Sequence, residues 1–251
     1  MLSTKKISKK FGSLVVAQDI DLALPRGVRY ALIGPNGAGK TTLINLMTGM
    51  LRPDSGQIFL GEGESATDIT ALRPDKRVHG GLARTFQINT LFPQLTPLES
   101  VALAVFERQR ISKVWWRNLP TYRDAIEEAH GILTSLRLHE VANRQTRELA
   151  YGQQRLLEIA LALATRPRVL LLDEPAAGVP KDESAELFEA IASLSSELTI
   201  LFIEHDMGVV FRFASRILVM VGGRILVEGT PHEISRDERV REVYLGRRHA
   251  A

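Results

Sequence analysis

Nine consecutive residues carry the strongest chemical signal in this sequence, because the first eight fit the pattern G-x-x-x-x-G-K-[ST] and the ninth is a second threonine. They are Gly34, Pro35, Asn36, Gly37, Ala38, Gly39, Lys40, Thr41 and Thr42. Glycines let backbone N–H groups converge on an anion, and the start of a following helix adds partial positive charge. The loop therefore suits the phosphates of a nucleotide such as ATP, with Lys40 neutralising the β- and γ-phosphates and the Thr41 hydroxyl binding Mg²⁺.

The flanks of this loop match the context that the motif requires. An apolar run from Val28 to Ile33 precedes it and predicts a buried strand, and residues 41–50 follow with apolar side chains at helical spacing. The alternative is a glycine-rich turn with a purely structural role. The order strand, loop, helix favours phosphate binding instead.

A second apolar run, Val169 to Leu172, ends in the carboxylates Asp173 and Glu174. Ligands of α/β sheets bind at the carboxyl ends of the strands, so both acids are expected to face the phosphates. Asp173 is suited to hold Mg²⁺, directly or through its water. Glu174 faces a different direction and is suited to activate the attacking water as a general base. A plain turn role for both acids is the alternative.

Apolar patterns along the chain predict the elements that position these residues. Alternation in the first thirty residues predicts two or three short strands, and another strand is expected at 57–60. The block from about 92 to 150 is helical, with helices at 98–110 and 122–138. After Gly152, helices at 153–165 and 182–195 alternate with strands at 169–172 and 199–203, and a hairpin turns on Gly222-Gly223. These βα units predict an α/β fold with a parallel sheet buried on both faces, interrupted by the helical block.

Composition limits the class of protein. The chain has 251 residues, 45% hydrophobic and 24% charged, and contains no cysteine, which fits a reducing compartment. No run approaches eighteen apolar residues, so no membrane span is predicted. Although the net charge is +3, the basic runs at 5–10 and 247–248 are short. They are expected to be solvated surface, and no nucleic-acid partner is expected.

The ordered set of motifs resembles the ATPase subunits of ABC transporters, most closely those that drive branched-chain amino acid uptake. The set includes the two motifs above and the fragments ARTFQ (83–87), LAYGQQR (149–155) and IEHDM (203–207). The resemblance implies a P-loop NTPase (RecA-like) core with an N-terminal antiparallel β subdomain and an inserted helical subdomain. Residues 1–251 would then form a single domain, with 1–91 and 153–251 as the core and 92–152 as the helical subdomain.

The resemblance also implies roles for three further residues. Phe11 matches the aromatic side chain that stacks on adenine, although a phenylalanine at the end of a strand is often simply core. Gln87 matches the glutamine that reaches Mg²⁺ and water and senses the membrane partner. His205 matches the histidine that hydrogen-bonds the γ-phosphate, whereas a lone histidine after a strand is more often structural.

Residues Ala150, Tyr151, Gly152 and Gln153 match the signature loop of the family, which opens a helix and binds the ATP held by the other subunit. Two ATP molecules are then enclosed between two subunits. Two positions depart from the family pattern. Ala150 replaces a serine and removes a hydroxyl donor, and Pro180 replaces an aspartate or asparagine.

By this resemblance, the protein is expected to hydrolyse ATP and to energise import of branched-chain amino acids through separate membrane subunits. It would lie at the cytoplasmic face of the membrane, paired with itself or a second ATPase subunit, with a substrate-binding protein as an indirect partner. A short helix of the membrane subunit would enter a groove near Gln87, where Trp115 and Trp116 are more simply interpreted as packing. The alternatives are urea or amide import, lipid export, a non-transport ABC ATPase, a small-molecule kinase and a non-enzymatic adaptor.

Overall fold

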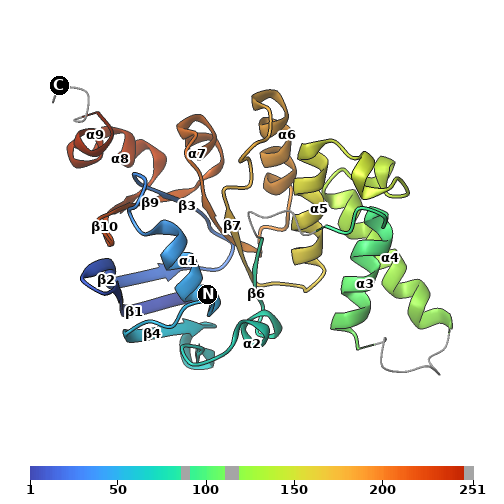
Figure 1. Cartoon of the computed structure of the whole chain (residues 1–251), viewed down its shortest axis with the longest axis horizontal. Coiled ribbons are helices and arrows are strands. Elements are labelled where there is room, and N and C mark those ends of the chain that lie inside the picture. The colour runs from blue at the N-terminus through green and yellow to red at the C-terminus, as the bar shows by residue number, and fades with distance from the viewer. Residues whose placement is uncertain (86–90, 111–118, 246–251) are drawn as a thin grey trace. The chain divides into compact units, whose positions relative to one another are not determined.

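The computed structural model describes residues 1–85, 91–110 and 119–245 (Figure 1). The chain divides into two compact units. Unit 1 consists of Met1–Arg84, Arg168–Glu174 and Ser196–Ala251, and unit 2 consists of Thr85–Pro167 and Pro175–Ser195. In the part of the chain that the structure describes, no helix is both long and apolar enough to cross a membrane.

Unit 1 contains two sheets. The antiparallel sheet has the strand order β2-β1-β4-β5, with β1 (Leu2–Phe11), β2 (Leu14–Leu24), β4 (Ser55–Leu60) and β5 (Thr67–Asp68). The second sheet has the order β10-β9-β3-β8-β7-β6, with β3 (Arg29–Ile33), β6 (Leu82–Arg84), β7 (Val169–Asp173), β8 (Thr199–Ile203), β9 (Arg216–Val221) and β10 (Arg224–Gly229).

The second sheet confirms the predicted parallel core. Strands β6, β7, β8, β3 and β9 pair in parallel, while β10 returns antiparallel to β9 across Gly222-Gly223. All residues of β7 and β8 are buried, as expected for strands covered on both faces. Parallel pairing places the carboxyl ends of β3, β7 and β8 at one edge of the sheet, where the predicted loop and acids begin.

The burial of β2 differs from the simple alternation in the sequence. Leu14 is exposed, and the buried positions run Ala17, Ile20, Leu22 and Leu24. The pairing of β1 with β2 is interrupted near Asp19, which has a φ of 47°. An irregularity of this kind shifts the phase of a strand and moves the residues before it to another face.

The helices of unit 1 follow or connect these strands. They are α1 (Lys40–Thr48), α2 (Pro74–His79), α7 (Met207–Phe213), α8 (Pro231–Arg236) and α9 (Glu238–Leu245), with a 3₁₀ turn at Gly63–Ser65. Helix α1 contacts β2 of the first sheet and β6 and β7 of the second (Figure 1). Its apolar face, including Leu43, Ile44 and Met47, is fully buried in a core that both sheets share.

Unit 2 is helical, as expected for residues 92–150, but it also includes residues 153–167 and 175–195, which the family resemblance assigned to the core. The subdomain bounds 92–152 stay a prediction. Its helices are α3 (Pro97–Arg108), α4 (Leu119–Ser135), α5 (Tyr151–Leu163) and α6 (Lys181–Ala192), with 3₁₀ turns at His139–Val141 and Thr146–Glu148. The helix expected at 122–138 begins three residues earlier, at Leu119, and ends at Ser135. Pro120 lies in the first turn of the helix, where a missing N–H breaks no hydrogen bond.

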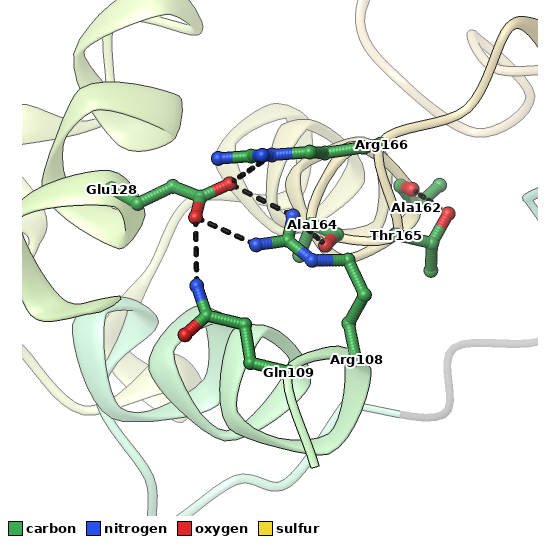
Figure 2. A network of polar contacts seen from close by, with 7 residues as sticks. All are labelled: Arg108, Gln109, Glu128, Ala162, Ala164, Thr165 and Arg166. Carbon is green, nitrogen blue, oxygen red and sulfur yellow. Dashed lines mark hydrogen bonds and ion pairs between the residues drawn. The ribbon is translucent and has the colours of Figure 1, made fainter. Parts of the chain in front are cut away.

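A charged cluster joins three helical segments of unit 2 (Figure 2). The Glu128 carboxylate of α4 accepts two hydrogen bonds from Arg108 of α3, at 2.8 and 2.6 Å, and one from Arg166 Nε after α5, at 2.8 Å. Arg108 also donates to the Ala164 carbonyl at 2.9 Å, and Gln109 donates to Glu128 at 3.2 Å. The hydrogen bonds from Arg108 and then Arg166 lower the pKa of Glu128 from 4.5 to about 2.

Replacing Glu128 with glutamine is expected to destabilise unit 2 by about 2–3 kcal/mol at neutral pH, because hydrogen bonds to a charged group are lost. A depressed pKa stabilises the fold above the ordinary value of 4.5, and this contribution disappears as the pH falls from 4.5 toward 2. The difference in urea midpoint between wild type and Glu128→Gln should therefore shrink over that range. The matched control is Glu127→Gln, an exposed neighbour in an i,i+4 pair with Arg123. An equal effect in both variants would contradict the role of the cluster.

Candidate nucleotide-binding site

The phosphate-binding loop connects β3 to α1, as the sequence predicts. Gly34 and Gly39 have φ values of 153° and 103°, in the region that favours glycine. A Cβ on Gly34 would overlap the Met220 carbonyl oxygen, and one on Gly39 would overlap the Val16 carbonyl oxygen. The loop therefore needs glycine at both positions, and Gly39 forms the N-cap of α1, whose first N–H groups stay available.

Lys40 begins α1 and turns back over the loop. Its ammonium group donates to the carbonyl oxygens of Gly34, at 2.8 Å, and Pro35, at 3.1 Å. Burial lowers the pKa of Lys40, and the nearby carboxylates of Glu174 and Asp173 oppose that shift. An anion entering the loop would replace the two carbonyl oxygens as partner of the ammonium group.

Asp173 ends β7 and is held by Arg84, the last residue of β6. Arg84 Nη2 donates to Asp173 Oδ2 at 2.7 Å, and Arg84 Nη1 donates to Asn45 Oδ1 on α1. The Asp173 side chain is fully buried and that of Arg84 is 10% exposed. Burial raises the pKa of Asp173, whereas Arg84 lowers it.

The second oxygen of this carboxylate points to a metal site. Asp173 Oδ1 is buried and has no hydrogen-bond partner among the residues that the structure describes. A buried carboxylate oxygen without a partner is costly unless a cation or water completes it. Mg²⁺ typically binds one or two side chains and fills its other positions with phosphate oxygens and water. The donor set of Asp173 with the exposed Thr41 hydroxyl fits that ion.

Glu174 and His205 meet at the carboxyl ends of β7 and β8. His205 Nε2 lies 3.0 Å from Glu174 Oε1. With Glu174 as a carboxylate, which only accepts, this contact corresponds to the imidazole tautomer that carries its hydrogen on Nε2. The Glu174 N–H donates to the Ile203 carbonyl oxygen, and the residue has a φ of 50°, which is uncommon for a residue with a side chain. Such strain is frequent where a side chain must be aimed at a reaction centre.

Glu174, His205 and most of the loop residues line one pocket of about 310 Å³ in unit 1, whereas Asp173 is not among its lining residues. Its lining comprises Leu14, Val16, Asn36, Gly37, Ala38, Gly39, Lys40, Thr41, Thr42, Glu174 and His205. The structure thus brings together the loop, the acid and the histidine that the sequence singled out. Phe11 lies at the end of β1, paired with Leu14, and is 50% exposed, so it is not a core residue.

The signature residues lie in unit 2. Ala150 is the N-cap of α5 and supplies no side-chain acceptor, and its own N–H donates to Gln153 Oε1 at 3.1 Å. Tyr151 is 39% exposed, and its hydroxyl accepts a hydrogen bond from Arg155 at 2.9 Å. A Cβ on Gly152 would lie 2.9 Å from Glu183 Oε2, which is the end of a flexible side chain and can move aside. The start of α5 can therefore present backbone N–H groups to an anion.

Gln87 and the pair Trp115-Trp116 lie outside the described residues. Pro180 is described as the N-cap of α6, where it offers no side-chain hydrogen bond.

Sequence reasoning missed the roles of Arg84 and Asn45. A basic residue at the end of an apolar strand, just before the ARTFQ glutamine, was the available signal for Arg84. Nothing in the spacing of Asn45 distinguishes it from an ordinary polar helix position.

Comparison with known families gives two matches. Residues 17–177 match the family described as "ABC transporter", and residues 224–250 match the family described as "Branched-chain amino acid ATP-binding cassette transporter". The first match includes the phosphate-binding loop, the start of α5 and the acids that end β7.

Individual proteins are similar over almost the whole chain. The high-affinity branched-chain amino acid transport ATP-binding protein BraF of Pseudomonas aeruginosa is 39% identical over 255 residues, covering 98% of each chain. LivG of Escherichia coli K12, with the same description, is 38% identical over the same coverage. Among solved structures, the ADP conformation of an ATP-binding cassette of an ABC transporter, MJ1267, superposes with a TM-score of 0.83 at 31% identity and covers 98% of both chains.

Proposed function

The chain belongs to the ABC transporter family as an ATP-binding cassette, and from this membership and its site we propose that it hydrolyses Mg-ATP to drive import of branched-chain amino acids. The observation that carries the catalytic part is the single pocket shared by the phosphate-binding loop, Glu174 and His205. Branched-chain amino acids are proposed as the transported substrate because of the names of the relatives and the second family match.

The proposal assigns a role in ATP binding or hydrolysis to each residue of the site. The loop N–H groups and Lys40 bind the β- and γ-phosphates, and Phe11 stacks on the adenine ring. Thr41, Asp173 and Gln87 would hold Mg²⁺, which neutralises charge on the phosphate oxygens when bound. Glu174 takes the proton of the attacking water. His205 orients the Glu174 carboxylate through their 3.0 Å contact, and its Nε2–H turns to the γ-phosphate when the nucleotide is present.

The proposal requires two cassettes. The start of α5, residues Ala150 to Gln153, is a second site for anions on the same chain, and in the family it serves the ATP of the opposite subunit. The loss of the serine hydroxyl at Ala150 removes one donor, while the N–H groups of the helix start remain. We therefore expect a pair formed by two copies of this chain or by this chain and a related cassette.

An apolar groove in unit 2 supports a membrane partner. It measures about 410 Å³ and is open to solvent, with Leu103 53% exposed and Ile126 43% exposed. Its lining comprises Leu95, Leu98, Glu99, Ala102, Leu103, Phe106 and Ile126. Exposed apolar patches of this kind mark interaction surfaces, so we place the contact with a helix of the permease here, at the cytoplasmic face of the membrane.

Replacing Leu103 with aspartate is expected to weaken binding to the membrane subunits at least about tenfold, because a charge in a buried apolar contact must be desolvated. ATP affinity should not change. Copurification of the cassette with membrane vesicles measures the effect. The control is Glu127→Gln, which changes an exposed residue of α4 that does not line the groove. Normal copurification of Leu103→Asp would remove the groove from the interface.

Uptake of labelled leucine tests the transport function directly. In a host that lacks the gene, wild type should restore uptake and Glu174→Gln should not. A substrate-binding protein outside the membrane would supply the amino acid. The contrary result is that loss of the gene leaves leucine uptake unaffected and abolishes uptake of urea or export of lipid. That result would contradict the proposed substrate but not the proposed ATP hydrolysis.

A further inference from the structure

We propose that Arg84 is a positioning residue that holds the Mg²⁺ ligands of β7 and α1 in register. Its guanidinium bridges Asp173 Oδ2, at 2.7 Å, and Asn45 Oδ1, so one planar group joins the end of a strand to a helix. A lysine ammonium is a point charge and does not reproduce this two-sided fork. The proposal rests on the metal-binding role proposed above for Asp173 and Thr41.

The contact with Asp173 fixes the orientation of the carboxylate, so that one of its two oxygens stays available to a metal. Arg84 occupies Oδ2, and this leaves the buried Oδ1 without a partner among the described residues. Without this contact, the Asp173 carboxylate could rotate about its side-chain bond. Because Arg84 holds Oδ2, the rotamer of Asp173 is fixed, and Oδ1 is the oxygen that remains available to a cation.

The contact between Arg84 and Asn45 also constrains Thr41, the second proposed Mg²⁺ ligand. Asn45 lies four residues after Thr41, so both are on one face of α1, about one turn apart. Fixing Asn45 against Arg84 fixes the face of the helix that carries the Thr41 hydroxyl. Arg84 thereby sets the separation of a ligand on β7 and a ligand on α1.

The test separates metal binding from nucleotide binding. Arg84→Met and Arg84→Lys are measured with a fluorescent ATP analogue in EDTA, and then by Mn²⁺ titration of the ATP complex followed by electron paramagnetic resonance. We expect analogue affinity in EDTA to stay within about twofold, while Mn²⁺ affinity falls about tenfold or more in Arg84→Met, as is usual when a group that orients a metal ligand is lost. Arg84→Lys should recover part of the loss, because it keeps the charge but not the fork.

Asn45→Ala provides a variant that keeps the ion pair. It should weaken Mn²⁺ binding about threefold, and adding it to Arg84→Lys should cause little further loss, because the two residues act through one bridge. This variant also keeps the proposal testable if Arg84→Met fails to fold.

The control is Arg77→Lys, another buried arginine, which donates to the carbonyl oxygens of Leu46 and Met47 near the end of α1. It should lower the melting temperature without changing Mn²⁺ affinity. Equal losses of Mn²⁺ affinity in the Arg77 and Arg84 variants would reduce Arg84 to a structural role and overturn the proposal. Unchanged Mn²⁺ affinity in Arg84→Met and Asn45→Ala would also overturn it. If instead Asp173→Asn leaves Mn²⁺ affinity intact, the proposed metal site itself is wrong.

Discussion

Replacing Glu174 with glutamine is expected to slow ATP hydrolysis by roughly 10²–10⁴-fold while ATP still binds. The amide cannot accept the proton of the attacking water, but it has the same size and can still contact His205. ATP should then persist between two cassettes and trap the pair. Phosphate release measures the rate, and size-exclusion chromatography with ATP measures the trapped dimer.

The matched control for this variant is Glu64→Gln, which neutralises an exposed carboxylate of unit 1 outside the pocket. It should leave hydrolysis unchanged. Turnover of Glu174→Gln near the wild-type rate would remove Glu174 from the role of general base.

Replacing Lys40 with alanine is expected to weaken ATP binding by about 3 kcal/mol, or on the order of 10²-fold, because the ammonium group makes charge-assisted contacts with the phosphates. The loss should be smaller for a nucleotide without the γ-phosphate. Titration with fluorescent ATP and ADP analogues measures both affinities.

A matched control exists for this change too. Lys76→Ala removes an exposed lysine of α2 and should bind ATP normally. Since Lys40 also satisfies the carbonyl oxygens of Gly34 and Pro35, the melting temperature of Lys40→Ala must be recorded with its affinity. A folded Lys40→Ala protein with wild-type affinity for ATP would contradict phosphate binding by this loop.

The α/β fold was predictable because its signals are local. The apolar runs that became β3, β7 and β8 are fully or mostly buried, and their lengths and order imply parallel pairing. The loop between β3 and α1 was predictable because its motif is a local pattern, and the structure requires glycine at 34 and 39 through close backbone contacts. Phosphate binding by the loop stays a prediction. Glu174 was selected as an acid at the end of an apolar strand and His205 on resemblance, and the structure places their side chains in contact.

Other features depend on contacts between distant segments, which a single sequence does not reveal. Arg84 and Asn45 are 39 residues apart, and Arg84 and Asp173 are 89 residues apart, so their bridge has no signal in local spacing. The change of phase in β2 depends on the backbone at Asp19 and on its pairing with β1. Short elements such as β6 and α7 are fixed by their neighbours rather than by their own periodicity.

Phosphate release per cassette, measured across protein concentrations, tests most directly whether one chain holds only half of each catalytic site. The rate per cassette should fall toward zero as purified protein is diluted below the concentration at which it pairs, as followed by mass photometry with ATP. A rate per cassette that stays constant in material shown to be entirely monomeric would contradict the requirement for a second cassette.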